Sequence, residues 1–497
     1  MPHSKSRRTF LRNAGLLAGG TALVSLARVA RAQNDPQPDP NENCAPPGSG
    51  SLPTPTPFQP NNSLPLRTRK SAWDLTASEV TRLNAAYEKL RALPADDPRS
   101  WLAQAHVHCF NCSGSTDFPS GVEIHGGWWF MPWHRAYLYF HERILASLVG
   151  DDTFALPYWD WDNTARQTFP QAYATAGLPT FDTNREATPT STPSLGDVFT
   201  EFQIDIPSIL QDNDYELFMG NGIYPSGTAG NVENGPHGIT HLWTAQPSLQ
   251  DMNGIIDMGV LQTAGRDPVF FCHHANIDRL WWSWIGAGNA NPNDSSWLNQ
   301  TFTFYDENKV WTSIRISDTI DAASSMHYQY ETSAIPPKTA SLKSNRVILA
   351  SSAEQTTTQG SDPTTKELSL PQELRTTVPK SRSVTRRYIL HIDGIDVPAD
   401  RSAIVRVFVN LPKATAATSA KSPNYVGFFT IVAHTINPAT HNHGSHKINQ
   451  AFDVTKQLGA VLKGASKLQV TLVPVSGLHD RPENFTLSYD KVYLTEK

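Results

Sequence analysis

The sequence has little net charge and no polybasic run beyond its first residues. Its 497 residues include 41 lysines and arginines against 46 aspartates and glutamates, which leaves a net charge of -5. This balance argues against nucleic acid as the main partner. A hydrophobic fraction of 39% with 13 tryptophans indicates a globular chain, and its length allows more than one domain.

Long hydrophobic runs are also missing. The apolar stretch near the N-terminus, residues 14–26, is too short for a permanent membrane span. It follows a twin-arginine box, SRRTFLR at residues 6–12, and precedes ARA at residues 30–32, which fits a cleavage site. These features predict a twin-arginine signal peptide over residues 1–32. We therefore expect a bacterial protein exported to the periplasm or secreted, with no membrane contact after cleavage.

Cysteines are few. After cleavage the chain keeps Cys44, Cys109, Cys112 and Cys272. Export permits disulfides, and an even count allows two of them. Cys109 and Cys112, however, lie three apart in a histidine-rich stretch, so metal or modified-cysteine chemistry is an equally open alternative.

Composition divides the mature chain into four parts. Residues 33–70 begin rich in Pro, Asn and Ser and are predicted to form an extended arm. Residues 71–337 carry helical patterns separated by long loops, which predicts a mainly α-helical domain. Residues 338–385, rich in Ser, Thr, Lys and Gln, are typical of an exposed linker. Residues 386–497 contain short β-rich runs, which predict an all-β sandwich.

Four helices are expected in the mainly helical domain. The first begins with a capping box formed by Thr76 and Glu79, and the second has Pro132 near its first turn. The four segments are residues 76–93, 132–149, 233–243 and 267–285.

Histidines gather in two groups along the chain. The first group is His106, His108, His125, His134 and His141, and the second is His237, His241, His273 and His274. On a helix, His237 and His241 share one face and can bind one metal ion. A third imidazole would come from the pair at 273–274, of which only one points inward because adjacent helical residues point about 100° apart.

The first group needs partners from elsewhere in the chain. His134 and His141 share a helical face but lie about 10.5 Å apart along the axis, so they cannot both bind one ion. His134 therefore requires ligands from the loops that precede it. All-imidazole sites suit copper, zinc, iron or nickel, and three histidines with an open position would also fit catalytic zinc.

Four long motifs around these histidines resemble those of type 3 dicopper proteins. They are VHCFNC (107–112), WWFMPWHRAYLYFHERIL (128–145), PHGITHLW (236–243) and AGRDPVFFCHHANIDRLW (264–281). The resemblance is closest to plant-type polyphenol oxidases, the catechol oxidases and tyrosinases. It implies a mainly α catalytic domain, with a four-helix-bundle dicopper core and long loops, followed by a C-terminal β-sandwich that can shield the active site.

The resemblance also implies the metal ligands. Two copper ions are the expected cofactor. The first would be bound by His108, His125 and His134, and the second by His237, His241 and His274. The remaining histidines of the two groups, His106, His141 and His273, are then expected to pack or hydrogen-bond without binding metal.

The cysteines receive roles from the same resemblance. It implies a thioether between Cys112 and His125, which would fix the imidazole, and a disulfide between Cys44 and Cys109, which would pin the arm to the catalytic domain. Cys272 is left as a buried free thiol. The segments RTR (67–69) and YQY (328–330) match those that bracket the family's catalytic domain, and we expect them to pair with each other.

Four residues bear on activity and access. Glu233 matches a family glutamate that holds a water for phenol deprotonation, although a helix N-terminus also favours a glutamate. Gly238 stands where several family members have an asparagine sharing that water, which argues against monophenol hydroxylation. Leu261 replaces a phenylalanine that covers one copper, and together with Gly238 it indicates an entrance wide enough for bulky phenols. Gly238, Leu242 and Leu261 are assigned to substrate access.

The resemblance implies a copper-dependent phenol oxidase. It would use O2 to hydroxylate monophenols such as tyrosine at the ortho position and to oxidise ortho-diphenols to ortho-quinones, as in melanin formation. The alternatives are a catechol oxidase without the first activity, a haemocyanin-like O2-binding protein with a covered site, and a zinc hydrolase. The expected partners are O2 and small phenols, and the sequence leaves the oligomeric state open.

Overall fold

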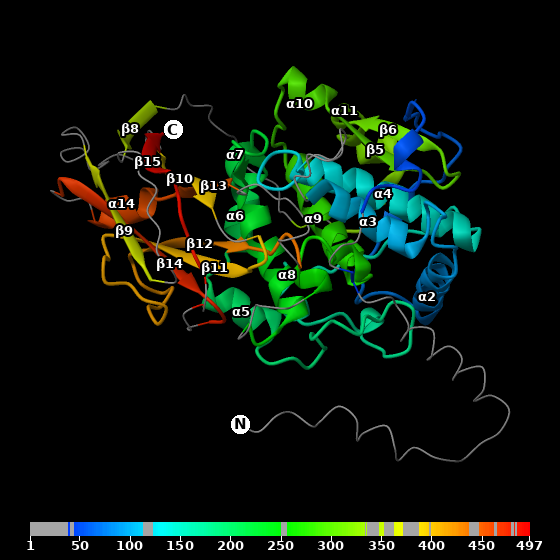
Figure 1. The fold of residues 1–497 in the computed structure, drawn as a ribbon, viewed down its shortest axis with the longest axis horizontal. Helices are drawn as coiled ribbons and strands as arrows, with labels where there is room; N and C mark the ends of the chain where they lie inside the picture. The colour runs from blue at the N-terminus through cyan, green and yellow to red at the C-terminus, as the bar shows by residue number, and fades with distance from the viewer. Residues whose placement is uncertain are drawn as a thin grey trace, which may run out of the picture.

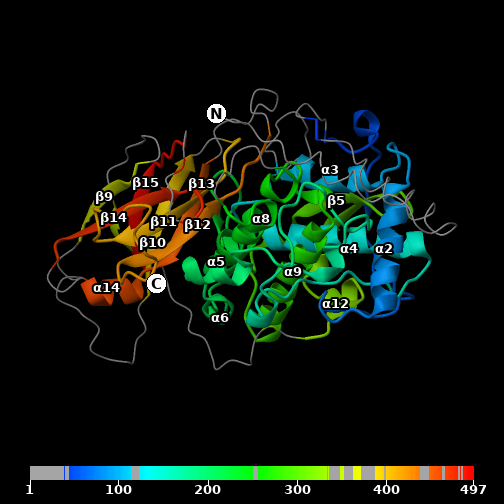
Figure 2. The same cartoon turned by 90° about the horizontal axis from the view of Figure 1, so that it is seen from below.

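A helical core is followed along the chain by a C-terminal sheet region, as the computed structural model shows (Figure 1). The two parts lie side by side, and the view from below shows α8 and α5 next to the sheet strands (Figure 2). The structure describes residues 38–39, 44–112, 123–249, 256–332, 334, 347–351, 362–370, 387–396, 399–436, 447–461, 465–478, 482 and 485–497. The predicted signal peptide and much of the predicted linker lie outside these ranges.

Four long helices build the helical core, and one of them was not expected. They are α2 (Ala77–Arg91), α3 (Trp101–Cys112), α4 (Phe130–Val149) and α9 (Val269–Gly286). The predicted capping box at the start of α2 is present. Hydrophobic periodicity does not reveal α3, because the helix is buried on most sides and its sequence has little polar contrast. Histidine, cysteine, phenylalanine and asparagine are also weak helix formers.

The segment 233–243 differs from the single α-helix that was expected. It begins as a five-residue π-helix, η5 (Glu233–His237), and continues as α8 (Gly238–Ala245). Pro236 lies inside η5 and has no N–H to donate, so regular α-helical bonding is interrupted there. The N–H of Gly238 instead bonds to the carbonyl of Glu233, five residues back. Short π-helical insertions of this kind recur at functional sites.

Shorter helices connect these elements. The α-helical ones are α5 (Leu195–Glu201), α6 (Ile206–Gln211), α7 (Tyr215–Phe218), α10 (Ser295–Asn299), α11 (Ile316–Thr319), α12 (Ala322–Ser325) and α14 (Thr455–Val461). The 3-10 turns are η2 (Ser49–Ser51), η3 (Thr164–Arg166), η4 (Gln171–Tyr173), η6 (Asp257–Gly259) and η7 (Ala264–Arg266).

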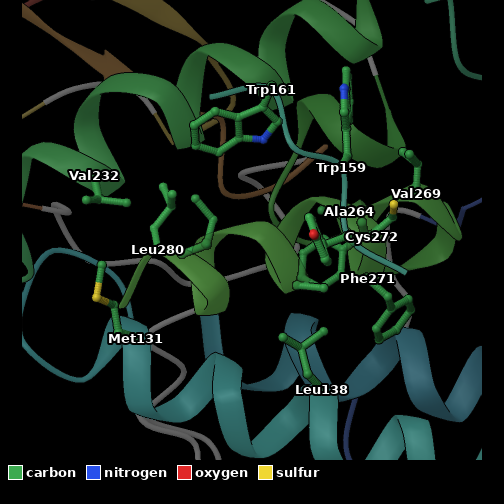
Figure 3. Packing of buried hydrophobic residues seen from close by; sticks show 14 of the residues in the cluster. Met131, Leu138, Trp159, Trp161, Val232, Ala264, Val269, Phe271, Cys272 and Leu280 are labelled. Atoms are coloured by element: carbon green, nitrogen blue, oxygen red, sulfur yellow. The ribbon is translucent and has the colours of Figure 1, made fainter. Parts of the chain in front are cut away.

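The hydrophobic core of the helical part packs α4 against α9. Figure 3 shows Met131 and Leu138 of α4 on one side and Phe271 and Leu280 of α9 on the other. All seventeen residues from Phe130 to Ala146 are buried. Burial of each large side chain contributes about 1.5–3 kcal/mol. The same packing fixes the two helices that carry histidines from both groups.

The C-terminal region contains two sheets. One has the order β3-β4-β13-β10-β15-β8 and the other β12-β11-β14-β9. Their strands are β3 (Gly220–Asn221), β4 (Thr228–Ala229), β8 (Val347–Ser351), β9 (Thr364–Ser369), β10 (Tyr388–Asp396), β11 (Ala403–Val409), β12 (Tyr425–Ile431), β13 (Lys447–Asp453), β14 (Lys467–Val475) and β15 (Lys491–Glu496). Buried side chains from both sheets form one cluster, and β4 of the helical part pairs with β13.

Two strands lie inside the predicted exposed linker. β8 pairs with β15 and β9 pairs with β14, each at the edge of its sheet. The side chains of β9 alternate between buried or half-buried and exposed. An edge strand with one solvated face has a polar composition, and this is why composition alone predicted a linker over β9, whereas β8 is a short apolar run inside a polar stretch.

A smaller pairing joins the two ends of the helical part. β2 (Arg67–Arg69) runs parallel to β7 (Tyr328–Tyr330), as predicted. The Arg69 guanidinium lies 3.8 Å from the centre of the Tyr328 ring, and Arg67 and Arg69 both form ion pairs with the buried Glu142 of α4. The remaining strands, β1 (Thr56–Pro57), β5 (Thr301–Tyr305) and β6 (Trp311–Arg315), form a three-stranded sheet in the order β1-β6-β5.

The predicted disulfide between Cys44 and Cys109 is present, with a Cα–Cα distance of 5.8 Å. It ties the N-terminal arm to α3 across 65 residues. Because it closes a long loop, we expect the double variant C44S/C109S to lose about 2–4 kcal/mol of unfolding free energy. Denaturant unfolding with and without a reductant measures this: the reduced parent protein should match the variant, and equal stability of oxidised parent and variant would contradict the prediction.

Candidate metal centre

The first histidine group converges on one point. His108 lies on α3, His134 lies on α4, and His125 lies on the segment that enters α4. One ring nitrogen of each lies within 4.8 Å of the others, and all three side chains are buried. The expectation that the partners of His134 come from loops is correct for His125 and wrong for His108, because α3 was not anticipated.

The second group converges in the same way. His237 ends η5, His241 lies one turn further along α8, and His273 and His274 lie on α9. The four side chains are buried, with ligand atoms within 4.8 Å of one another. The rings of His134 and His274 stack with centroids 4.2 Å apart, so the two groups are neighbours.

Hydrogen bonds at Nδ1 select the tautomer in which Nε2 can bind a metal. A backbone carbonyl only accepts, so a ring nitrogen that bonds to it must carry the proton. Four of the predicted ligands have this arrangement, with Nδ1 at 2.7 to 3.1 Å from a carbonyl oxygen: His108, His134, His237 and His241. The Nε2 atoms of His108, His125, His134 and His237 are buried without a hydrogen-bond partner. Such unprotonated, buried nitrogens fit metal ligation.

The same reasoning separates His273 from His274. The indole Nε1 of Trp161 donates to Nδ1 of His273 at 3.0 Å. An indole nitrogen only donates, so Nδ1 of His273 is unprotonated and its proton lies on Nε2, which is then unsuited to metal. Nε2 of His274 faces Nε2 of His241 at 3.2 Å. This arrangement favours His274 as the ligand, as the resemblance implied.

Burial keeps these imidazoles neutral. It lowers the pKa of His108 to about 3 and that of His241 to about 4. It also lowers the pKa of His125, His134, His237 and His274 well below the usual value, and neighbouring histidines lower it further. Metal binding requires the neutral ring, so no deprotonation has to precede it near neutral pH.

Glu233 occupies the position expected of it beside the second group. Its Oε1 accepts a hydrogen bond from the N–H of Gly126 at 2.7 Å, and its Oε2 is buried without a partner. Burial raises the pKa of Glu233 to about 8. The side chain lines a cavity of about 60 Å³ that His125, His237 and Leu261 also line.

Gly238 is required by a close approach and not by its backbone angles. It has an ordinary helical φ of -62°, but a Cβ at this position would lie 1.8 Å from Oγ1 of Thr430 in β12. That hydroxyl donates to the carbonyl of Asn234 at 2.8 Å. The space beside Gly238, expected to widen the entrance, is therefore filled by the C-terminal sheet region in this structure.

The other two access residues differ in their placement. Leu261 lines the cavity, and its N–H donates to the carbonyl of Ala433 at 2.8 Å, so the C-terminal region covers it. Leu242 is fully buried in the hydrophobic core and is not among the residues that line the cavity. Its expected role in access has no support from this position.

The remaining sequence candidates lie nearby. Cys112 is a buried free thiol that contacts the carbonyl of Cys109 at 3.4 Å, and its thioether to His125 stays a prediction. His141 bonds to Gln104 at 3.1 Å through Nδ1 and to Tyr87 at 3.3 Å through Nε2. It is a buried packing histidine, as expected. Cys272 is the predicted buried free thiol.

Two residues near the site were missed by sequence reasoning. Glu123 bonds to His125 through both the backbone and the ring, and its position two residues before a predicted ligand was the available signal. Thr430 lies almost two hundred residues after Gly238, and only the fold brings them together. No local pattern in the sequence marks that contact.

The chain matches three families of known domains. They are the common central domain of tyrosinase over residues 98–216 and 199–287, the polyphenol oxidase middle domain over residues 291–343, and the chloroplastic polyphenol oxidase C-terminal domain over residues 367–483. The match to the first, together with the two histidine clusters, confirms the predicted pair of copper ions as the cofactor and removes the zinc hydrolase alternative.

Individual proteins match over most of their length. A chloroplastic polyphenol oxidase of Vitis vinifera is 34% identical over 485 residues, which cover 88% of this chain and 77% of that protein. The latent form of a chloroplastic polyphenol oxidase of Prunus armeniaca is 32% identical over 472 residues, covering 87% and 76%. The structure of latent apple tyrosinase superposes with a TM-score of 0.70 at 27% identity, covering 89% of this chain and 100% of the other.

These relatives overturn the expected localisation. Both plant relatives are chloroplastic proteins, which contradicts bacterial export by the twin-arginine route to the periplasm or medium. The expectation was wrong because a segment rich in arginine, with serines and no acidic residue, is typical of transit peptides as well as of export signals. Residues 1–32 have this composition and lie outside the described part of the chain.

Among the described residues, none of the helices combines the length and the apolar character needed to cross a membrane.

Proposed function

This chain belongs to the tyrosinase and plant-type polyphenol oxidase family, a family of copper oxidoreductases acting on phenols with O2, and from that premise we propose that it both hydroxylates monophenols and oxidises ortho-diphenols. The observation that carries the proposal is the pair of histidine triads, in which four imidazoles bond to backbone carbonyls through Nδ1 and so keep Nε2 free to bind copper. When bound, the copper pair supplies O2 activation and the two-electron oxidation of phenols. The protein supplies positioning, proton transfer and access.

The copper ligands in this proposal are His108, His125 and His134 for the first ion and His237, His241 and His274 for the second. The helices α3, α4, α8 and α9, together with the segment before α4, hold them as a four-helix bundle. A thioether between Cys112 and His125 would further restrict the orientation of that imidazole. Buried packing of α4 against α9 supports the required rigidity.

Glu233 is proposed to hold the water that takes the phenol proton. A phenol has a pKa near 10, so a base helps it to bind as phenolate. The unpartnered Oε2 is buried at a cavity with room for water, since about 10–15 Å³ suffices for one molecule. Gly238 brings no side chain to share that water, so Glu233 alone would position it.

The C-terminal sheet region is proposed to keep the intact chain latent. The cavity of about 60 Å³ is smaller than an engineered apolar cavity of roughly 150 Å³ that binds benzene. Thr430, Ile431, Val432 and His434 form part of its wall. Residues 386–497 would thus act as a sandwich-shaped shield over the catalytic domain, residues 71–337, and a phenol could enter only after it moves.

Steady-state kinetics with L-tyrosine and L-DOPA test the proposed function. We expect copper-loaded protein, after limited proteolysis within residues 338–385, to oxidise L-DOPA at once and L-tyrosine after a lag. The intact chain should be at least about tenfold slower, because a tenfold effect requires only about 1.4 kcal/mol of closure. Protein stripped of copper with a chelator is the control.

Each other outcome assigns a different function. Turnover of L-DOPA without L-tyrosine would make the protein a catechol oxidase. Reversible O2 binding without turnover of either substrate, before and after proteolysis, would make it haemocyanin-like and contradict the proposal. The haemocyanin-like alternative is included because the C-terminal region covers the cavity.

A further inference from the structure

A segment of the C-terminal region runs along the proposed metal centre. Residues 430–432 and His434 line the cavity that the proposed ligands His125 and His237 also line. Burial and neighbouring histidines lower the pKa of His125, and His434 is one of these neighbours. The closed structure therefore shows that a polypeptide chain fits along this cavity and places a ring close to the proposed copper ligands.

Backbone hydrogen bonds hold this segment to the rim of the helical part, which we define as residues 260–262. The N–H of Leu261 donates to the carbonyl of Ala433 at 2.8 Å. The N–H of Gln262 donates to the carbonyl of His434 at 3.1 Å, and Val260 forms a parallel β-bridge with Ala433. Every peptide carries such backbone groups, so these bonds supply affinity for an extended chain of any sequence.

The side chain of Gln262 adds a contact that a single amino acid cannot make. Its Oε1 accepts the N–H of Ile436 at 3.1 Å and the hydroxyl of Thr435 at 3.0 Å. The N–H of Ile436 belongs to the second residue after His434. A free amino acid bound at the position of His434 has no group that could replace this N–H, whereas a longer peptide has one.

The rim is also bonded directly to the proposed metal centre. The carbonyl of Leu261 accepts a hydrogen bond from Nδ1 of His108 at 2.8 Å, while its N–H binds the C-terminal segment. One residue therefore connects a proposed copper ligand to the chain held over the cavity. A peptide bound in the same register would present one side chain at a fixed position relative to the copper pair, which is what an oriented reaction requires.

We propose that the open enzyme accepts tyrosine and DOPA residues inside extended peptides, bound to the rim as residues 433–436 are bound in the closed chain. The phenol ring would take the place of the His434 side chain, and the shield would exclude such substrates by competing for the same backbone groups. This substrate class rests on the proposed function, because it requires the shield to move and the copper pair to oxidise phenols.

The reaction needs no further co-reactant. One tyrosine ring and one O2 give one ortho-quinone and one water: one oxygen atom forms a bond to the ortho carbon, and the other leaves with the ortho hydrogen and the phenol hydrogen. A DOPA ring loses two electrons and its two hydroxyl hydrogens, so one O2 oxidises two DOPA rings and leaves as two waters.

Kinetics with three DOPA substrates test the proposal on the copper-loaded chain cleaved within residues 338–385. They are L-DOPA, N-acetyl-DOPA amide, and an acetylated hexapeptide amide with the sequence of residues 431–436 and DOPA at its fourth position. The second adds a carbonyl for the N–H of Leu261, and the third adds an N–H for Gln262. A neutral hydrogen bond changes binding by about 2–12-fold, so kcat/KM of the hexapeptide should exceed that of L-DOPA by about 5–150-fold. A value no higher than that of L-DOPA would overturn the proposal.

An ester analogue and the variant Q262A provide matched controls. An ester oxygen in place of the N–H of the sixth residue should lower kcat/KM of the hexapeptide by about 2–12-fold. In Q262A the amide and the ester should react equally, and a difference that persists would overturn the proposal. Q262A also loosens the shield, but this affects all substrates alike, so their ratios are compared. If Q262A does not fold, equal rates of amide and ester with the parent protein would refute the proposal.

A binding measurement separates this proposal from the proposed function. The hexapeptide with phenylalanine at its fourth position carries no phenol, and its affinity for the copper-free cleaved chain is measured by isothermal titration calorimetry. We expect it to bind about 2–12-fold more tightly than its ester. Equal affinity of the two, with L-DOPA still oxidised, would overturn peptide recognition alone. Tighter binding of the amide without any oxidation of L-DOPA would overturn the proposed function and confirm the rim as a peptide-binding edge.

Discussion

The variant H241A should bind one copper ion per chain instead of two and should have no measurable turnover of L-DOPA. His241 presents Nε2 towards His274 at 3.2 Å and is held by the carbonyl of Met258 at 2.7 Å. Even the loss of a group behind a ligand costs about 10–100-fold in affinity or activity, so the loss of a ligand should cost more. Elemental analysis and steady-state kinetics measure both effects.

His273 provides the matched control for this experiment. It is as buried as His241 and belongs to the same four-histidine cluster, but the donor Trp161 places its proton on Nε2. Asparagine retains an acceptor for the indole, so H273N should keep two copper ions per chain. Loss of one copper ion in H273N together with its retention in H241A would refute the ligand assignment.

The metal-binding chemistry of the site could be predicted because its histidines lie in short sequence motifs. The pair His237 and His241 lies one helical turn apart, and the resemblance of four motifs placed the other ligands. Residues four apart on a helix share a face, whatever the tertiary structure around the helix. The disulfide and the pairing of residues 67–69 with 328–330 came from the same resemblance and are present.

The features that sequence reasoning missed depend on contacts between distant parts of the chain. The helix α3 is buried on nearly all sides, so hydrophobic periodicity could not reveal it. The strand β9 has a polar sequence because it lies at a sheet edge with one solvated face, and the apolar β8 is only five residues long inside a polar stretch. The glycine at position 238 was interpreted as open space, whereas the fold puts Thr430 there. The contact between Gly238 and Thr430 forms only once the C-terminal region has docked.

That contact leads to a second large effect: G238A should activate the intact chain without proteolysis. Alanine suits the helical backbone of α8 better than glycine does, but its Cβ would lie 1.8 Å from Oγ1 of Thr430. Overpacking of this kind costs about 1–3 kcal/mol. Because each 1.4 kcal/mol is a factor of ten, the equilibrium between closed and open shield should shift by about 5–150-fold towards the open form.

The companion variant T430G tells whether this shift comes from the shield. Removing the threonine side chain should restore room for the new methyl group, so G238A/T430G should return towards the latent rate. The comparison is made with L-DOPA on intact chains, with proteolysed protein giving the fully open rate for each variant.

Several other contacts hold the shield, among them the ion pair of Arg387 with Asp212 at 2.7 Å. R387A should therefore also raise the intact rate, but less, because a partly exposed pair contributes only about 0–1 kcal/mol. If intact G238A stays as latent as the parent while intact R387A is activated, the Arg387–Asp212 ion pair holds the shield. The contact at Gly238 then does not control entry of the substrate.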